Sequence, residues 1–193
     1  MKLMLATTNT DRFEKMCGLL FKIRPEIEFV GSTVEEPLEN GKCGLDNAII
    51  KAKHYSLNQE IPVLAFDNEI YFDHWTGIPQ PGHLIHSFNK KIGSKEDIYN
   101  FWENKIINGV TSGCLIKHFA LCAKKEIFFT TVSVPFRLAL EAGKKSIPKD
   151  NILNVFMVPA GFKHSFAELS DKERDMYDEK YFQTALRNIL NQL

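Results

Sequence analysis

The order of short apolar runs and helix-like segments over residues 1–66 is the feature that most restricts the fold of this chain. Residues 2–6, KLMLA, form a brief apolar run, and from residue 12 onward apolar side chains recur at helical spacing. Residues 27–31 and 62–66 predict two further strands, and residues 48–58 predict a second helix between them. This alternation of strands and helices predicts an α/β fold.

Polar residues that can cap a helix precede the helical segments. They stand at residues 9–11 before the first helix and at residues 46–47 before the second. Ser170 is followed three residues later by Glu173, and this spacing is typical of a capping box. It predicts a C-terminal helix that runs to about residue 190.

The second half of the chain is richer in strand-like sequence. Residues 69–75 are expected to pair as a hairpin with the strand at 62–66, and residues 76–83 form a turn-rich segment. A helix is expected at residues 94–106. Three runs rich in β-branched and aromatic residues then predict strands at 114–123, 126–140 and 151–159.

Composition excludes several classes of protein. The chain has 193 residues, 44% of them hydrophobic, which suits a soluble protein of one domain or of two small lobes that share a sheet. Lys and Arg together number 24, as do Asp and Glu, so no nucleic-acid or membrane-surface binding is expected. No segment is apolar over the roughly 18 residues that a membrane-spanning helix needs.

The four cysteines do not predict a metal site. They are Cys17, Cys43, Cys114 and Cys122, and no pair has the spacing of a zinc motif. The six histidines likewise lack HxH or HExxH spacing. The first residues, MKLMLATTN, turn polar too soon for a signal peptide, so a cytoplasmic protein with reduced thiols is expected.

A set of short motifs occurs in one order along the chain. The set comprises ATTN at 6–9, an acidic loop at 31–45, NAIIKA at 47–52, VLAFDN at 63–68, PG at 81–82 and FAELS at 166–170. As a set it resembles the inosine triphosphate pyrophosphatase family, whose members cleave non-canonical purine nucleoside triphosphates to monophosphate and pyrophosphate. The resemblance implies an elongated mixed central sheet flanked by helices, in two lobes with a cleft between them. It also implies one domain over residues 1–193 and a homodimer.

The first motif is a candidate triphosphate-binding loop. Backbone N–H groups between a strand end and a helix start favour an anion. The resemblance places Thr7, Thr8, Asn9 and Arg12 there, with Arg12 at the position of a family lysine. A guanidinium keeps the charge and can bind a phosphate with two hydrogen bonds. The alternative is a capped helix beside a solvated arginine.

Three further residues match the family's metal and catalytic positions. Glu39 lies twelve residues before Lys51, and Asp67 lies sixteen after it, which is the family spacing. The resemblance implies that Glu39 and Asp67 bind Mg²⁺, which prefers oxygen ligands. Asp67 would take a proton from the attacking water, Lys51 would neutralise phosphate charge, and Asn68 would hydrogen-bond the substrate. Alternatively, Glu39 is one acid among several in its loop.

The chain also departs from the family pattern at several positions. Phe66 replaces the first of two adjacent acids, and Glu69 replaces a usual glycine. At the end that recognises the base, Leu153 replaces an aspartate and Arg174 replaces a lysine. The family's His-Arg pair falls at Glu179–Lys180. An ionised glutamate accepts hydrogen bonds, so a base bearing an exocyclic amine is expected rather than hypoxanthine or xanthine.

The sequence therefore predicts a Mg²⁺-dependent nucleoside triphosphate pyrophosphatase that acts on a non-canonical or modified nucleotide with altered base specificity. One alternative is a catalytically inactive relative that serves as a nucleotide-binding or protein-interaction module. Another is a pyrophosphatase of the related septum-inhibitor type, acting on modified pyrimidine nucleotides. The acids and the phosphate loop favour the enzyme, whereas Phe66, Leu153 and Glu179 favour the inactive relative.

Overall fold

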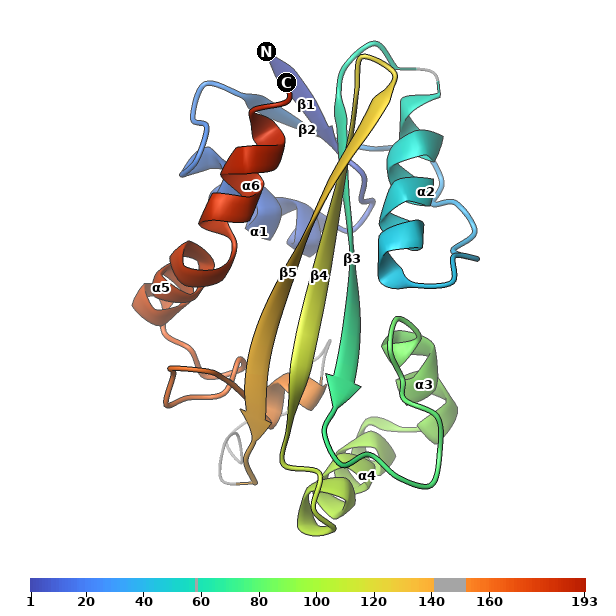
Figure 1. Cartoon of the computed structure of the whole chain (residues 1–193), viewed down its shortest axis with the longest axis vertical. Coiled ribbons are helices and arrows are strands. Elements are labelled where there is room, and N and C mark those ends of the chain that lie inside the picture. The colour runs from blue at the N-terminus through green and yellow to red at the C-terminus, as the bar shows by residue number, and fades with distance from the viewer. Residues whose placement is uncertain (58, 141–151) are drawn as a thin grey trace. The chain divides into compact units, whose positions relative to one another are not determined.

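A computed structural model describes residues 1–57, 59–140 and 152–193. Its strands form one six-stranded sheet in the order β2-β1-β3-β4-β5-β6 (Figure 1). The strands are β1 Lys2–Leu5, β2 Glu28–Gly31, β3 Val63–Phe72, β4 Ser112–Ala123, β5 Glu126–Leu138 and β6 Met157–Pro159. Because β1 runs parallel to β2 and β3 whereas β5 and β6 are antiparallel, the sheet is mixed, and the predicted α/β class is confirmed.

Helices connect or follow these strands. They are α1 Thr10–Phe21, α2 Gly44–Ser56, α3 Ile85–Ile92, α4 Lys95–Ile107, the 3-10 helix η1 Ile152–Val155, α5 Asp171–Tyr181 and α6 Gln183–Leu190. No helix within the described parts of the chain is long and apolar enough to cross a membrane.

The described chain divides into two compact units. The first contains residues 1–68, 117–132 and 178–193, and the second contains residues 69–116 and 133–177. Strands β3, β4 and β5 therefore each contribute residues to both units. The candidate phosphate and metal residues before residue 69 all belong to the first unit.

In the first unit, α2 packs on one face of the sheet through small residues. Ala48, Ala52 and Tyr55 of this helix are buried against strand residues that include Ala65 and Ala120. Alanines at the contact let a helix approach a sheet closely, and the buried apolar surface stabilises the pair by roughly 25 cal/mol per Å². The position of α2 on this face is thus fixed by packing along its whole length.

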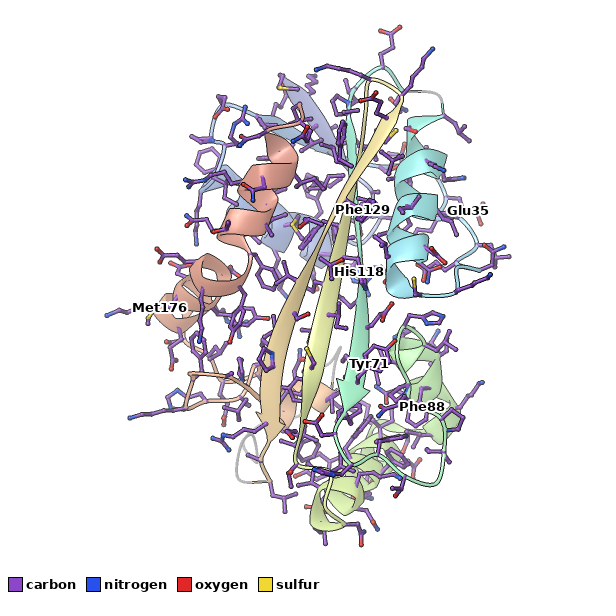
Figure 2. All side chains as sticks on the ribbon, viewed as in Figure 1. Glu35, Tyr71, Phe88, His118, Phe129 and Met176 are labelled. Atoms are coloured by element: carbon purple, nitrogen blue, oxygen red, sulfur yellow. The ribbon has the colours of Figure 1, made fainter. Side chains whose placement is uncertain are left out.

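The second unit has an aromatic core. The ring of Phe72 lies 5.2 Å from that of Trp75, 4.8 Å from that of Trp102 and 5.8 Å from that of Phe136, measured between ring centres. Phe88 of α3, labelled in Figure 2, packs on the same group with its ring 6.1 Å from Trp75. Offset and edge-to-face aromatic pairs of this kind add stability beyond the area that they bury.

Several element predictions are correct and several are wrong. The strands at 2–6, 27–31, 114–123 and 126–140 and the helix at 94–106 are confirmed with small changes in their bounds. The hairpin at 69–75 is wrong, because β3 continues without a turn to Phe72. Helix α3 was not predicted, since its apolar residues directly follow a turn-rich segment. The expected strand at 151–159 is η1 followed by a short β6, with residue 151 outside the described residues.

The helix ends also test the sequence predictions. Asn9 is the cap of α1, and its side chain accepts a hydrogen bond from the backbone N–H of Arg12. The capping box is confirmed, because Ser170 and Glu173 exchange side-chain and backbone hydrogen bonds. The predicted cap of α2 at residues 46–47 is wrong, since the helix starts earlier, after Cys43. The predicted C-terminal helix is divided at Phe182 into α5 and α6.

Candidate phosphate and metal site

Strand β3 carries Asp67 to a partly buried position in the first unit. One carboxylate oxygen, Oδ1, accepts a hydrogen bond from the backbone N–H of Asn68 at 2.9 Å. The other oxygen, Oδ2, is buried and has no hydrogen-bond partner among the described residues. Burial raises the pKa of Asp67, although the nearby ammonium of Lys51 acts in the opposite direction. A buried acid with a raised pKa and an unsatisfied oxygen is a typical feature of a functional site.

Lys51 lies between the two predicted metal-binding acids. Its ammonium nitrogen is 2.6 Å from Oε1 of Glu39 and 3.8 Å from Oδ1 of Asp67. The two carboxylate oxygens are therefore no farther apart than the sum of these distances. The structure thus brings together the three residues whose spacing matches that of the family.

Helix α2 positions Lys51 through its contact with the sheet. Ala48 and Tyr55, one turn to either side of Lys51, are buried against the sheet, so Lys51 projects from the same helix face. Its side chain is 8% exposed, whereas those of Asp67 and Glu39 are 17% and 40% exposed. The ammonium is thus largely shielded from water, and its charge is compensated mainly by the two acids.

The acidic loop before α2 is attached to its surroundings at several points. The hydroxyl of Thr8 donates to the carboxylate of Glu36 at 3.2 Å. His54 Nε2 on α2 lies 3.1 Å from the carbonyl oxygen of Glu35, the residue labelled on this loop in Figure 2. These contacts hold the loop between the start of α1 and the outer side of α2.

The predicted phosphate loop has the expected local geometry. Thr7 is buried, and its hydroxyl accepts a hydrogen bond from the backbone N–H of Asn9 at 3.2 Å. Thr8 and Arg12 are exposed, and the side chain of Asn9 caps α1. Thr7 and Asn9 therefore shape the start of the helix, and Arg12 offers a positive charge beside it.

Phe66 does not face the same side of the sheet as Asp67. Neighbouring residues of a strand point to opposite faces, and Asp67 is on the side of α2. The ring of Phe66 lies 6.5 Å from that of Phe119, which in turn lies 6.2 Å from that of Phe182 at the start of α6. An acid at position 66 would therefore enter this aromatic row and would not join Lys51 and Asp67.

Three of the residues expected to recognise the base, Arg174, Glu179 and Lys180, lie on α5. In the second unit, Arg174 donates to the backbone carbonyl oxygens of Leu169 at 3.1 Å and Phe166 at 3.3 Å, so its guanidinium stabilises the start of α5. Glu179 and Lys180 are exposed on the same helix, with the Lys180 ammonium 5.0 Å from the ring centre of Tyr181.

Two of the substituted positions have structural roles. Leu153 is fully buried in η1, so it belongs to the hydrophobic core. Glu69 is buried, and its carboxylate accepts a hydrogen bond from the hydroxyl of Tyr71 at 2.8 Å. Asn68 is exposed at the middle of β3.

The donors available to a metal ion are the two acids beside Lys51. Within the described residues there is no group of three or more His, Cys, Asp or Glu side chains that could hold an ion by themselves. Mg²⁺ commonly takes one or two carboxylates and completes its shell with water and substrate phosphates. Glu39 and Asp67, with the unsatisfied Oδ2 of Asp67, fit that demand.

Sequence reasoning gave Asn47 only the role of a possible helix cap. In the structure Asn47 is buried, with 2% of its surface exposed, and its side chain lies between the acidic loop and Asp67. A position one helical turn before Lys51 would have indicated that both side chains lie on one face of α2.

Comparison with known proteins identifies the family and the fold. A model of the Ham1 family matches residues 3–191. The dITP/XTP pyrophosphatases of Vibrio parahaemolyticus and Vibrio cholerae are each 34% identical to the chain over 82 residues, which is 40% of this chain and 40% of each relative.

Solved structures show the same fold. A HAM1 protein from Coxiella burnetii superposes with a TM-score of 0.78 at 20% identity and covers 100% of both chains. The Ham1 protein of Staphylococcus aureus gives a TM-score of 0.74 at 15% identity, covering 100% of this chain and 99% of the other. The family model spans nearly the whole length and the fold agrees from end to end, so the chain belongs to the Ham1 family.

Proposed function

We propose that this protein is a Mg²⁺-dependent pyrophosphatase that hydrolyses a nucleoside triphosphate to the monophosphate and pyrophosphate. The observation that carries the proposal is the ammonium of Lys51 held between the carboxylates of Glu39 and Asp67. Relatives that match 40% of the chain are named dITP/XTP pyrophosphatases, which supports the same reaction type.

Each residue of the candidate site has a distinct role in the proposed reaction. Glu39 and Asp67 would hold the metal ion, which when bound supplies charge neutralisation and a more acidic water. Asp67 accepts a proton from the attacking water, and the raised pKa that burial gives it favours such a role. Lys51 exchanges its contact with Glu39 for the phosphate oxygens of the substrate, and Arg12 offers a second cation at the start of α1.

Base specificity is proposed to differ from that of relatives that act on inosine and xanthosine nucleotides. Glu179 is exposed and accepts hydrogen bonds, so it would favour an exocyclic amine over a keto oxygen. Lys180 keeps a positive charge there but lacks the two-pronged geometry of an arginine. The proposal also includes the domain organisation, in which each chain is a single functional domain of two lobes. Two chains form a homodimer in the cytoplasm, without nucleic-acid or membrane partners.

The proposal is tested by measuring pyrophosphate release from a panel of canonical, deaminated and modified nucleoside triphosphates, with and without Mg²⁺. Asp67→Asn and Lys51→Met are expected to lower turnover at least about 100-fold, because each removes a group that acts at the reacting phosphate. Glu60→Gln, a change at an exposed acid of the same unit, serves as the matched control and leaves turnover unchanged. Turnover that survives in Asp67→Asn contradicts the assignment.

A nucleotide-binding module without catalysis is the second candidate. It is favoured by Phe66, an aromatic residue at a position where the family resemblance has an acid. Calorimetric binding of a nucleotide that the protein does not hydrolyse under any metal condition would favour this candidate over the enzyme.

A further inference from the structure

Asn47 is a buried polar side chain in the first turn of α2. Its Oδ1 accepts a hydrogen bond from the backbone N–H of Gly41 at 2.9 Å. Its side chain also lies near the carboxylate of Asp67, whose Oδ2 has no hydrogen-bond partner among the described residues. A carboxamide can accept a hydrogen bond through its oxygen and donate one through its nitrogen, so the Asn47 side chain can interact with both the loop at Gly41 and Asp67.

The acidic loop lies directly against this turn of the helix. A Cβ atom added to Gly41 would meet Oδ1 of Asn47 at 2.5 Å, and it would meet Cβ of Asp46 at 2.7 Å. Real side chains almost never approach so closely, so only glycine lets the loop lie this near. The backbone N–H of Lys42 also donates to Asp46 at 3.1 Å. Two adjacent backbone groups of the loop are therefore fixed to adjacent residues of α2.

Glu39 stands two residues before this attachment. Its carboxylate reaches Lys51, which lies one helical turn after Asn47 on the same face of α2. The segment that carries Glu39 is thus held at its backbone by Asn47 and at its side chain by Lys51. Asn47 thus bonds the backbone of the Glu39 segment at Gly41 and lies near the Asp67 carboxylate.

We infer that Asn47 is a positioning residue that sets the separation of the Glu39 and Asp67 carboxylates, and hence the affinity of the site for a divalent cation. The inference rests on the proposed function for the identity of the two metal-binding acids. Removal of a side chain that orients a metal ligand without binding the metal itself commonly weakens metal affinity 10–100-fold.

Asp46 provides a matched control within the same turn. It holds the neighbouring loop N–H in the same manner as Asn47. Its side chain accepts from the backbone N–H of Lys42. Asp46→Ala therefore loosens the loop, whereas Asn47→Ala loosens the loop and also removes the group beside Asp67.

The experiment measures divalent-cation binding and local hydrogen exchange on the full chain. Mn²⁺ and Mg²⁺ affinity is determined by calorimetry, and the Mg²⁺ concentration for half-maximal pyrophosphate release is determined separately. Asn47→Ala is expected to weaken both at least about 10-fold while the KM for the nucleotide at saturating Mg²⁺ stays within about twofold. The Gly41 amide exchanges faster in Asn47→Ala, and the Lys42 amide exchanges faster in Asp46→Ala, whose metal affinity changes less than about threefold.

Gly41→Ala is a second variant that leaves Asn47 intact. The added methyl group would overlap Asn47 and Asp46 and so displace the loop from the helix, whereas Asp46→Ala removes one hydrogen bond and leaves Gly41 against Asn47. Cation affinity is therefore expected to fall in Gly41→Ala as in Asn47→Ala. The inference is overturned if either folded variant binds cations as tightly as the wild-type protein, or if the wild-type protein binds none. A protein that hydrolyses no nucleotide but shows the expected loss of cation affinity would refute the proposed function and leave the inference standing.

Discussion

Replacing Asp67 by asparagine tests whether this acid is held at a cost to stability. The carboxylate is largely buried, one of its oxygens has no partner among the described residues, and burial raises its pKa. Asparagine has nearly the same shape and carries no charge that must be taken out of water. Lys51 keeps its closer partner, Glu39 at 2.6 Å, so the substitution leaves no unpaired ammonium behind.

The expected gain is about 1 kcal/mol, in the range usual for removing strain at a functional site. For a chain of this length 1 kcal/mol corresponds to a rise in Tm of about 2–4 °C. The gain depends on pH with a definite sign. Because the pKa of Asp67 is higher in the folded protein than in the unfolded chain, the folded state binds the proton more tightly. The penalty is absent below the ordinary aspartate pKa of 3.8 and develops as pH rises through the raised pKa.

The assay is thermal unfolding of wild type and Asp67→Asn between pH 4 and pH 8, with a chelator present to exclude bound cations. The variant should melt higher at pH 8, and the difference should shrink as pH falls. Glu39→Gln is the matched control, because it removes the more exposed acid beside the same ammonium. It should not raise Tm. If Asp67→Asn melts at the same temperature as the wild-type protein or lower at pH 8, the argument that burial destabilises the carboxylate is wrong.

Three further predictions concern strand packing, glycine positions and a helix cap. Phe66→Asp should lower the free energy of unfolding by about 1–3 kcal/mol in denaturant titrations without raising pyrophosphate release, because the new acid faces an aromatic row; a gain in activity would contradict this. Gly113→Ala should destabilise the protein by several kcal/mol, since its methyl group would collide with the backbone of β3. Gly18→Ala has open space in a helix and should stabilise the protein by about 0.5–1 kcal/mol, so equal Tm shifts of the two variants would refute the contrast. Glu173→Gln should lose stability at neutral pH but not below pH 2, because the capping hydrogen bonds lower the pKa of Glu173 from 4.5 to about 2. A stability difference between variant and wild type that does not change between pH 4.5 and pH 2 would exclude that linkage.

Much of the element order follows from local sequence. The apolar periodicity and the caps at Asn9 and Ser170 identify α1 and the start of α5, because capping depends on residues within one turn. The errors occur where a local signal is overruled by packing. Polar residues in the middle of β3 suggested a turn, yet the strand continues to Phe72, whose ring is buried among Trp75, Trp102 and other aromatic side chains.

The candidate site shows the same division. The order of the motifs and the spacing of Glu39, Lys51 and Asp67 follow from the sequence alone, because both are properties of the chain in one dimension. The tertiary structure is needed to show that these three side chains meet, that Phe66 faces away from them, and that Asn47 lies between the acidic loop and Asp67. Which face of a strand is buried, and which loop lies against a helix turn, depends on elements distant in sequence, and no local pattern contains that information.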